Sequence, residues 1–284
     1  MNIDAKTQLC GLLGNPVDHS LSPAIHNAAF EHLGLNFVYL AFPVEDIEGA
    51  MRGIKALGNL RGFSVTIPHK VAVMPYLEDI ELTARHIGSV NTIVKENGKL
   101  TGYNTDASGA LLALQQAGVS LSQKKVLMLG SGGAARAIAF AIAGGEAVQS
   151  FTILGIDEKE RTRLVEELRE KTSIDVKQGN ISDATLGENL PGTHVLIHCT
   201  PVGMYPKTNE SCVPQHLLTS GLTIMDIVYN PMETRLLREG REKGCKVIAG
   251  IEMFVNQAVG QFERWTGHPA PLKVMRAVLE ARFQ

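Results

Sequence analysis

Short apolar runs alternate with amphipathic, helix-like stretches along almost the whole chain. In its first part the predicted strands are 9–13, 37–42 and 63–67, and the predicted helices are 22–33, 46–57 and 80–87. Strands that alternate with helices in this way are typical of βα units, which build a largely parallel sheet covered by helices. The hydrophobic pattern therefore predicts an α/β fold.

The same alternation starts afresh after a predicted hairpin, whose strands 90–94 and 99–103 turn at Asn97-Gly98. Beyond it the predicted strands are 124–129, 150–155, 195–199, 223–228 and 246–249, and the predicted helices are 134–143, 158–171, 233–243, 251–265 and 270–282. Two α/β lobes follow from this pattern, with the terminal helices returning to the first lobe. We expect residues 1–104 plus 247–284 to form one domain and residues 105–246 to form the other.

Length, charge and cysteine content exclude several classes of protein. The 284 residues, 44% of them hydrophobic, suffice for two domains with sizeable cores. A net charge of −2 without a basic run gives no reason to expect a nucleic-acid or membrane partner. The four cysteines lack CxxC spacing and the N-terminus lacks a signal peptide, which indicates reduced thiols in a cytoplasmic protein. The nine histidines form no metal-binding motif, so we expect no metal site.

A glycine-rich turn separates the predicted strand 124–129 from the helix that follows it. Gly130 permits a tight turn, Gly132 leaves room for a pyrophosphate, and the helix start supplies N–H donors. The third glycine of the usual dinucleotide pattern is displaced, although Gly133 and Ala135 still allow close packing of helix on strand. The candidate cofactor residues here are Gly130, Ser131, Gly132, Gly133 and Ala134. The alternative is a tight turn that holds no ligand.

Asp157 ends the segment FTILGID, just after the next predicted strand, where an adenine ribose would lie. A carboxylate at this position accepts hydrogen bonds from ribose hydroxyls and repels the 2′-phosphate of NADP. Arg161 and Arg163 follow on the predicted helix and could receive a phosphate instead, and Asp157 could simply begin that helix. NAD is therefore modestly favoured over NADP.

Two hydroxyls stand at the start of the first predicted helix, in the segment HSLSP. Ser22 and Pro23 have the residue types of an N-cap and a first helical position. Ser20 has no such role in the helix, and a helix N-terminus favours an anion. The second hydroxyl raises the question of a ligand at this end of the helix.

Lys70 and Asp106 each follow a predicted strand of the first lobe. Hydride transfer to a carbonyl requires a proton donor, and a lysine can serve when burial lowers its pKa. A neighbouring carboxylate raises the lysine pKa again while holding the side chain in place. The residues alone favour a structural Lys70–Asp106 salt bridge over a catalytic pair.

Eight segments, in this order along the chain, resemble the shikimate dehydrogenase family, which includes enzymes that use quinate as well as shikimate. They are HSLSP, VTIPHK, GSVNTIV, GYNTD, GSGGAAR, TPVGM, DIVYNPMETRLL and GIEMFVNQAVGQFERWTG. The resemblance extends from about residue 9 to 280. It implies an N-terminal α/β substrate domain and a Rossmann-type, doubly wound dinucleotide-binding domain.

The resemblance also implies roles for individual residues, each with a local structural role as its alternative. Lys70 and Asp106 match the catalytic pair, which reverses the interpretation drawn from the residues alone. The remaining matches are Ser20 and Ser22 for the substrate carboxylate, Thr66, Asn91 and Gln257 for the ring hydroxyls, Tyr229 on the substrate side, and Thr200, Met204, Gly250 and Met253 for the cofactor.

The chain departs from the family pattern at four places. Ser64 replaces a common asparagine, His198-Cys199 replaces Asn-Thr or Asn-Ala, and Glu252 replaces a glycine. At 155–157 the chain reads Gly-Ile-Asp where the family commonly has Asn-Arg-Thr. Loss of that arginine removes a partner for a 2′-phosphate, so the resemblance too favours NAD.

We therefore expect an oxidoreductase that interconverts 3-dehydroshikimate and shikimate with NAD or NADP. The first alternative is the same chemistry on quinate, or on both acids. A more remote alternative is a non-catalytic nucleotide-binding sensor, which would need neither Lys70 nor Asp106. A homodimer is compatible with the sequence, although no feature of it indicates one.

Overall fold

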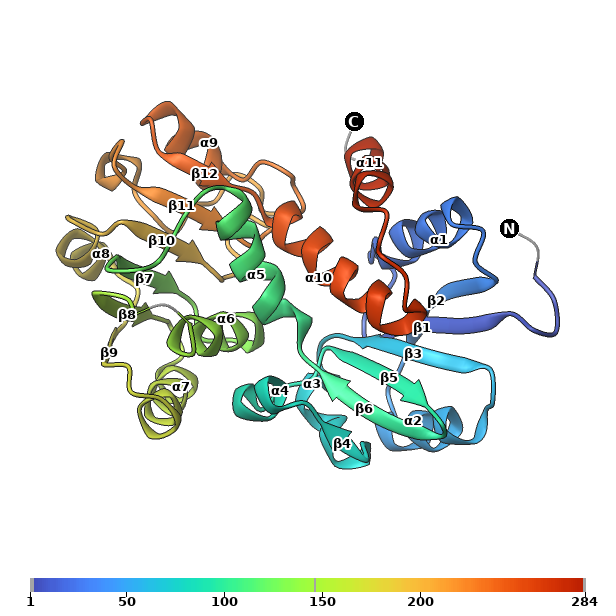
Figure 1. Ribbon diagram of the computed structural model, residues 1–284. Coiled ribbons are helices and arrows are strands. Elements are labelled where there is room, and N and C mark those ends of the chain that lie inside the picture. The colour runs from blue at the N-terminus through green and yellow to red at the C-terminus, as the bar shows by residue number, and fades with distance from the viewer. Residues whose placement is uncertain (1–2, 146, 283–284) are drawn as a thin grey trace. The chain divides into compact units, whose positions relative to one another are not determined.

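The computed structural model describes residues 3–145 and 147–282, and Figure 1 shows their helices and strands. The chain forms two compact units: unit 1 is Met1–Thr105 with Gln257–Gln284, and unit 2 is Asp106–Asn256. The chain passes from unit 1 to unit 2 after the first residue of α5 (Thr105–Gln116). It returns to unit 1 near the middle of α10 (Gly250–Thr266). The return to unit 1 therefore occurs inside one continuous helix, at Gln257, whereas the boundary expected from the sequence was at residue 247.

Unit 1 is built on a six-stranded mixed sheet in the order β2-β1-β3-β5-β6-β4. The strands are β1 (Gln8–Gly14), β2 (Phe37–Pro43), β3 (Leu60–Val65), β4 (Asp79–Ile80), β5 (Thr92–Glu96) and β6 (Lys99–Tyr103). β1 runs parallel to β2 and β3, whereas β5 is antiparallel to β3 and β6. Asn97 and Gly98 have φ of 51° and 78°, as the predicted two-residue hairpin turn requires.

The helices of unit 1 follow the predicted alternation closely. They are α1 (Ser22–His32), α2 (Ile47–Ala56), α3 (His69–Ala72), the 3₁₀ turn η1 (Met74–Tyr76), α4 (Leu82–Ile87) and α11 (Leu272–Arg282). The C-terminal α11 packs beside α1, so the end of the chain returns to this unit. Trp265 of α10 is buried against Gly62, where a Cβ would lie 2.2 Å from the indole nitrogen, and that nitrogen donates to the Ile93 carbonyl at 3.0 Å.

Unit 2 is a parallel, doubly wound sheet in the order β12-β11-β10-β7-β8-β9. Its strands are β7 (Lys125–Leu129), β8 (Ser150–Leu154), β9 (Val176–Gly179), β10 (Val195–His198), β11 (Thr223–Asp226) and β12 (Lys246–Ile248). Besides α5 and α10, its helices are α6 (Gly133–Ala143), α7 (Glu158–Lys171), α8 (Asp183–Asn189), η2 (Gln215–Leu217) and α9 (Arg235–Glu242). The chain leaves β7 first toward β8 and later toward β10, so the winding reverses between β7 and β10. Ligands bind at such a point in open α/β sheets.

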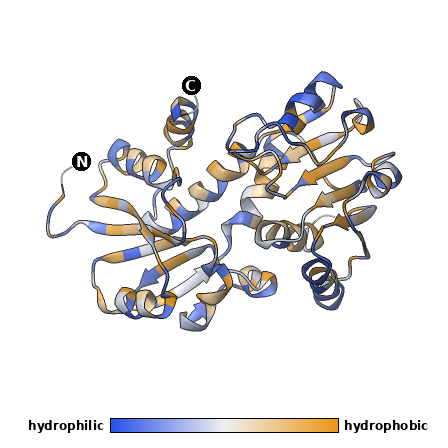
Figure 2. Cartoon of the chain, turned by 180° about the vertical axis from the view of Figure 1, so that it is seen from behind, coloured by the Kyte–Doolittle hydropathy of each residue, from blue (hydrophilic) through white to orange (hydrophobic). Residues whose placement is uncertain are grey.

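The central strands of unit 2 are buried on both faces, as is typical of parallel sheets. All four residues of β10 and residues 126–129 of β7 are buried, and Figure 2 shows these strands as mainly hydrophobic. The sequence pattern did not predict α5, β9 or α8; in β9 only Val176 is buried, which leaves almost no hydrophobic signal. In the described ranges no helix is long and apolar enough to cross a membrane.

Candidate functional site

Two loops of unit 1 bring the first predicted site residues together at the carboxyl ends of β1 and β3. These strands are parallel neighbours, and the Asn15 N–H donates to the Ile67 carbonyl at 3.0 Å just beyond them. Gly14 is required here because a Cβ on it would lie 2.3 Å from Cγ2 of Thr66. The loop that carries Ser20 therefore packs against the loop that carries Thr66.

The start of α1 differs by one residue from the prediction. Ser22 was expected to be the N-cap, but the helix begins at Ser22 and Leu21 is the N-cap, without a side-chain capping bond. Ser20 supplies the bond instead, since its Oγ accepts the Ser22 N–H at 3.2 Å. This leaves the buried Ser22 hydroxyl to interact with the phenol of Tyr39. The prediction that Ser22 caps the helix is therefore wrong.

Lys70 lies in the short helix α3, directly after Pro68. Its neighbour His69 is buried, and the His69 ring nitrogen Nε2 lies 2.7 Å from the Val44 carbonyl. The Lys70 carbonyl accepts the Val90 N–H at 2.8 Å. These contacts fix the backbone of the half-buried Lys70 against the segment that precedes Asn91.

Asn91 is almost fully buried and links the hairpin to the start of α5. Its Oδ1 accepts the Thr105 N–H at 2.8 Å, and its Nδ2 donates to the Thr105 hydroxyl at 3.1 Å. The Thr92 hydroxyl donates to the same Oδ1 at 2.7 Å. Asn91 therefore holds the residue that directly precedes Asp106.

A chain of neutral hydrogen bonds continues from Thr92 to Tyr39 through the interior of unit 1. Nε2 of Gln261 donates to the Thr92 hydroxyl at 3.1 Å, and its Oε1 accepts from the Ser64 hydroxyl at 2.9 Å. Ser64 in turn accepts the Tyr39 hydroxyl at 2.8 Å. We call Tyr39, Ser64, Gln261, Thr92, Asn91 and Thr105 the unit 1 network. Ser64, a departure from the family pattern, is its central member.

Gln257 belongs to the same end of unit 1, one helical turn before Gln261 on α10, and is largely buried. Lys70 is also in unit 1, whereas Asp106 is the first residue of unit 2 and is buried in the first turn of α5. The pairing of their side chains stays a prediction.

The glycine-rich turn of unit 2 contains glycines with different structural requirements. Gly130 has φ of +110°, and a Cβ on it would lie 2.7 Å from the Cys199 carbonyl, so the fold itself demands glycine. At Gly132 and Gly133 an added Cβ would meet no described atom within 4 Å. The N-cap of α6 is Gly132, which provides no side-chain capping bond. Open space beside the uncapped start of an 11-residue helix fits a bound pyrophosphate.

The end of β8 is acidic, as expected from Asp157, and a second carboxylate joins it. The exposed Asp157 is the N-cap of α7, accepting the Glu160 N–H at 2.9 Å. The Glu160 carboxylate accepts the Ser131 hydroxyl at 3.2 Å and so lies beside the glycine-rich turn. Sequence reasoning missed Glu160, although its position three residues after a helix N-cap is one from which acidic side chains often reach back.

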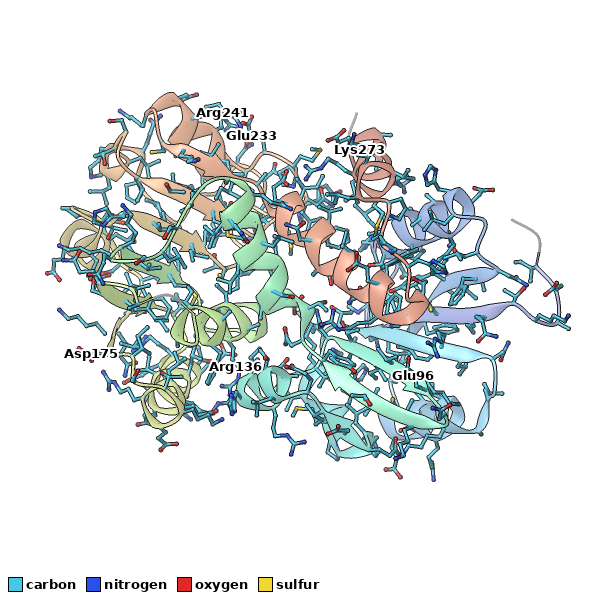
Figure 3. All side chains as sticks on the ribbon, viewed as in Figure 1. Glu96, Arg136, Asp175, Glu233, Arg241 and Lys273 are labelled. Carbon is cyan, nitrogen blue, oxygen red and sulfur yellow. The ribbon has the colours of Figure 1, made fainter. Side chains whose placement is uncertain are left out.

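Two arginines near the same turn are held by internal partners. The buried Arg161 donates to the Gly155 carbonyl at 2.5 Å and to the Gln178 side chain at 3.1 Å. Arg136, labelled in Figure 3, forms a 2.5 Å ion pair with Glu167 of α7. These bonds compete with any role in binding a 2′-phosphate.

The remaining candidates lie after the other strands of unit 2. Thr200 follows β10 and contacts the turn, since its Cγ2 would lie 3.3 Å from a Cβ on Gly130. Met204 lies in the loop after β10 and is 47% exposed. The Tyr229 ring stacks on Phe254 with centroids 4.6 Å apart, and burial raises the Tyr229 pKa.

The start of α10 packs tightly on the loop after β11. A Cβ on Gly250 would lie 2.4 Å from the Val228 carbonyl, so this approach requires glycine. Met253, one turn later, is buried. No group of three or more His, Cys, Asp or Glu in residues 3–145 and 147–282 is placed to hold a metal ion.

Two family models match the chain. The shikimate dehydrogenase substrate binding domain matches residues 12–93, and the shikimate 5′-dehydrogenase C-terminal domain matches residues 250–280. A shikimate dehydrogenase (NADP(+)) of Methanopyrus kandleri is 44% identical over 99% of this chain and 98% of that protein. One of Moorella thermoacetica is 42% identical over 98% and 95%. The chain belongs to the shikimate dehydrogenase family.

Solved structures of the family superpose closely on the chain. A shikimate dehydrogenase in complex with NADP+ has a TM-score of 0.93 at 39% identity and covers 100% of this chain and 98% of its own. A shikimate 5-dehydrogenase from Listeria monocytogenes, in complex with shikimate and NAD, has 0.91 at 35% identity, with 98% of each chain covered. A quinate dehydrogenase from Corynebacterium glutamicum, in complex with NAD, has 0.90 at 27%, covering 97% and 99%. The predicted family and the predicted two-domain, Rossmann-type fold are confirmed.

Proposed function

We propose that this chain is a shikimate dehydrogenase, which interconverts 3-dehydroshikimate and shikimate with NAD or NADP. Its similarity to relatives of that name over nearly their full length carries this proposal. The open glycine-rich turn of unit 2 and the polar loops of unit 1 support it, because they are the two kinds of site the reaction needs. Unit 1 is then the substrate domain and unit 2 the dinucleotide domain.

Binding of the acid would fall to residues of unit 1. Ser20 and Ser22 would hold the carboxylate at the start of α1, where the helix dipole favours an anion. Tyr229 would contribute from unit 2. Thr66, Asn91 and Gln257 would hold the ring hydroxyls, and the unit 1 network supports Asn91 by holding it in a single orientation. A fixed carboxylate and fixed hydroxyls orient the reacting carbon.

Lys70 would move the proton of the reaction. In the reducing direction its ammonium gives a proton to the oxygen that becomes the hydroxyl, and in the oxidising direction its amine takes that proton back. Asp106 would orient Lys70 and stabilise its charged form. The backbone bond between Lys70 and Val90 supports this role because it limits where the side chain can begin.

The residues of unit 2 fit a nicotinamide dinucleotide. Its nicotinamide supplies the hydride acceptor or donor when bound. Gly130, Ser131, Gly132, Gly133, Ala134 and the start of α6 would hold the pyrophosphate, and Thr200, Met204, Gly250 and Met253 would line the nicotinamide half. Asp157 and Glu160 favour NAD over NADP because a 2′-phosphate would bring further negative charge to this end of β8.

The substrate proposal is tested by steady-state oxidation of shikimate and quinate with NAD and, separately, with NADP; malate is a control acid that lacks the ring. Quinate carries an extra hydroxyl on the carbon that bears the carboxylate, the group assigned to Ser20 and Ser22. We expect a higher kcat/KM for shikimate, with 3-dehydroshikimate as the product identified by mass. A higher kcat/KM for quinate would replace shikimate dehydrogenase by quinate dehydrogenase, and oxidation of neither acid would refute the proposal.

A further inference from the structure

His198 and Asp226 form a buried pair at the carboxyl edge of the unit 2 sheet. They are the last residues of the neighbouring strands β10 and β11 and lie opposite each other in register. Their side chains are 1% and 0% exposed, and His198 Nδ1 lies 2.8 Å from Asp226 Oδ1. The functional assignments made so far give neither residue a role.

Asp226 is held on both of its oxygens, which fixes the imidazole in turn. Oδ1 also accepts the Val228 N–H at 3.0 Å, and Oδ2 accepts the Thr234 hydroxyl at 2.6 Å. Thr234 is itself the N-cap of α9. Because a carboxylate only accepts hydrogen bonds, Nδ1 of His198 must carry a hydrogen.

The other imidazole nitrogen contacts Thr200. His198 Nε2 lies 2.5 Å from Thr200 Oγ1, and the Val202 N–H donates to the same oxygen at 3.3 Å. Burial by itself lowers the pKa of His198, but hydrogen bonds and charge from Asp226, together with Cys212, outweigh it and raise the pKa to about 10. The Asp226 carboxylate therefore favours the protonated imidazole, in which both ring nitrogens donate.

The Thr200–His198–Asp226 arrangement has the connectivity of a nucleophile triad but not its chemistry. A triad histidine must accept the proton of the hydroxyl, whereas the buried Asp226 carboxylate, held on both oxygens, favours a His198 that already carries both protons. With N–H groups donating to both lone pairs of Thr200 Oγ1, its hydroxyl hydrogen is left to donate elsewhere. A hydroxyl can otherwise donate or accept a hydrogen bond, but the His198–Asp226 pair leaves the Thr200 hydroxyl only its role as a donor.

The position of Thr200 identifies the ligand group. Thr200 contacts Gly130 of the glycine-rich turn and follows β10, on the opposite side of β7 from β8 and Asp157. A dinucleotide whose adenine ribose lies at β8 and whose pyrophosphate lies at the turn extends its other half toward β10. That half carries ribose and carboxamide oxygens, which accept hydrogen bonds.

We propose that His198 and Asp226 position the Thr200 hydroxyl as a hydrogen-bond donor to the nicotinamide nucleoside half of the dinucleotide. The proposal rests on the proposed function, because it requires a dinucleotide at the turn. His198 is a positioning residue that acts through Thr200.

Two substitutions of His198 separate its two bonds. In His198→Asn the side-chain amide can replace Nδ1 and keep a partner for Asp226, but it is too short to replace Nε2. In His198→Gln the longer amide can reach toward Thr200. We would measure the dissociation constant of NADH for both variants, for Thr200→Val and for the double variant His198→Asn/Thr200→Val. His216→Asn, which changes an exposed histidine of the same unit, is the control.

We expect His198→Asn to weaken NADH binding by about two- to 13-fold, the range for one lost hydrogen bond between neutral groups, here from the Thr200 hydroxyl. His198→Gln should lose less NADH affinity than His198→Asn. The double variant should bind NADH as tightly as Thr200→Val does, since His198 acts only through Thr200. The inhibition constant of ADP, which lacks the nicotinamide nucleoside, should change less than twofold. Thr200→Val tests the donor even if a His198 variant fails to fold.

Other outcomes would overturn the proposal. Wild-type affinity in His198→Asn or Thr200→Val, an additive loss in the double variant, or an equal loss of ADP affinity would each show that the pair does not act through a nicotinamide-side donor. Failure of wild-type protein to bind either NADH or NADPH would instead refute the proposed function, so the two failures are distinct.

Discussion

His26 in unit 1 and His198 in unit 2 are both buried histidines, and their surroundings shift their pKa values in opposite directions. His26 stacks on Tyr39 with ring centroids 4.6 Å apart and lies 5.1 Å from Trp265. Burial lowers its pKa to about 3, opposed only by a weak interaction with Gln261 that lacks good hydrogen-bond geometry. His198 has a carboxylate partner and a pKa of about 10. One histidine is therefore neutral and the other charged at the same pH.

The difference shows two ways of holding functional groups in place inside a protein. Unit 1 uses hydroxyls and amides in a neutral network, in which each member costs little to bury once it is bonded. Unit 2 uses an ion pair, which orients its neighbour strongly but makes each partner indispensable to the other. Substitution of one member of the unit 1 network should therefore lower the free energy of unfolding only slightly. Substitution of one partner of the ion pair in unit 2 should lower it much more.

The largest effect that we expect is at Lys70, where a substitution should lower turnover strongly and leave dinucleotide affinity almost unchanged. If Lys70 carries the proton, Lys70→Ala lowers kcat by about 10²–10⁴-fold, the usual contribution of a general acid or base. NADH binding, assigned to unit 2, should change little. Lys99→Ala, at an exposed lysine of β6, is the control. Near-normal turnover in Lys70→Ala would remove Lys70 from the mechanism.

Loss of one partner should cost more in the ion pair than in the neutral network. Asp226→Asn should lower the free energy of unfolding by about 3–5 kcal/mol, since it leaves a buried charge without its counterion. Tyr39→Phe, which removes one hydrogen bond from the unit 1 network, should cost about 1 kcal/mol. Urea unfolding of both variants measures the two values. Equal losses of unfolding free energy in Asp226→Asn and Tyr39→Phe would show that the ion pair of unit 2 is no more sensitive than the neutral network of unit 1.

The two histidines should also give stability opposite dependences on pH. The pKa of folded His198 is raised from 6.5 to about 10, so its contribution is complete below pH 6.5 and is lost as pH rises toward 10. The pKa of folded His26 is lowered to about 3, so its contribution is complete above pH 6.5 and is lost as pH falls toward 3. Each should change stability by up to about 1.4 kcal/mol per pH unit.

Thermal unfolding midpoints of wild type, His198→Asn and His26→Phe across this pH range check both signs. His198→Asn should flatten the loss of stability above pH 6.5, and His26→Phe should flatten the loss below it. A variant that flattens the opposite limb would contradict the assigned charge of that histidine.

Dinucleotide preference should shift least. Asp157→Asn removes the charge but keeps a side chain that caps helices well. Because Asp157 is exposed, we expect the ratio of kcat/KM with NAD to that with NADP to fall by only about fivefold. Glu158→Gln, the adjacent exposed carboxylate, is the control. An unchanged ratio would show that Asp157 serves only as the N-cap of α7.

Apolar runs and glycine patterns predicted the elements whose burial leaves a clear signal. The buried strands β7, β8 and β10 and the turn between β7 and α6 were located this way, whereas the polar edge strand β9 was missed. Contacts between distant segments were out of reach, because no local pattern records them. Ser64 and Gln261 are 197 positions apart, and His198 and Asp226 are 28 apart. The sequence could mark Ser64 and His198 as unusual for the family but could not say what they contact.

The rate of dinucleotide reduction by shikimate, measured with NAD and NADP side by side on the purified chain, tests the account most directly. We predict reduction of both dinucleotides in step with formation of 3-dehydroshikimate, and a higher kcat/KM with NAD. A higher value with NADP would contradict the assignment of the acidic end of β8. Absence of shikimate-dependent reduction with either dinucleotide would contradict the account as a whole.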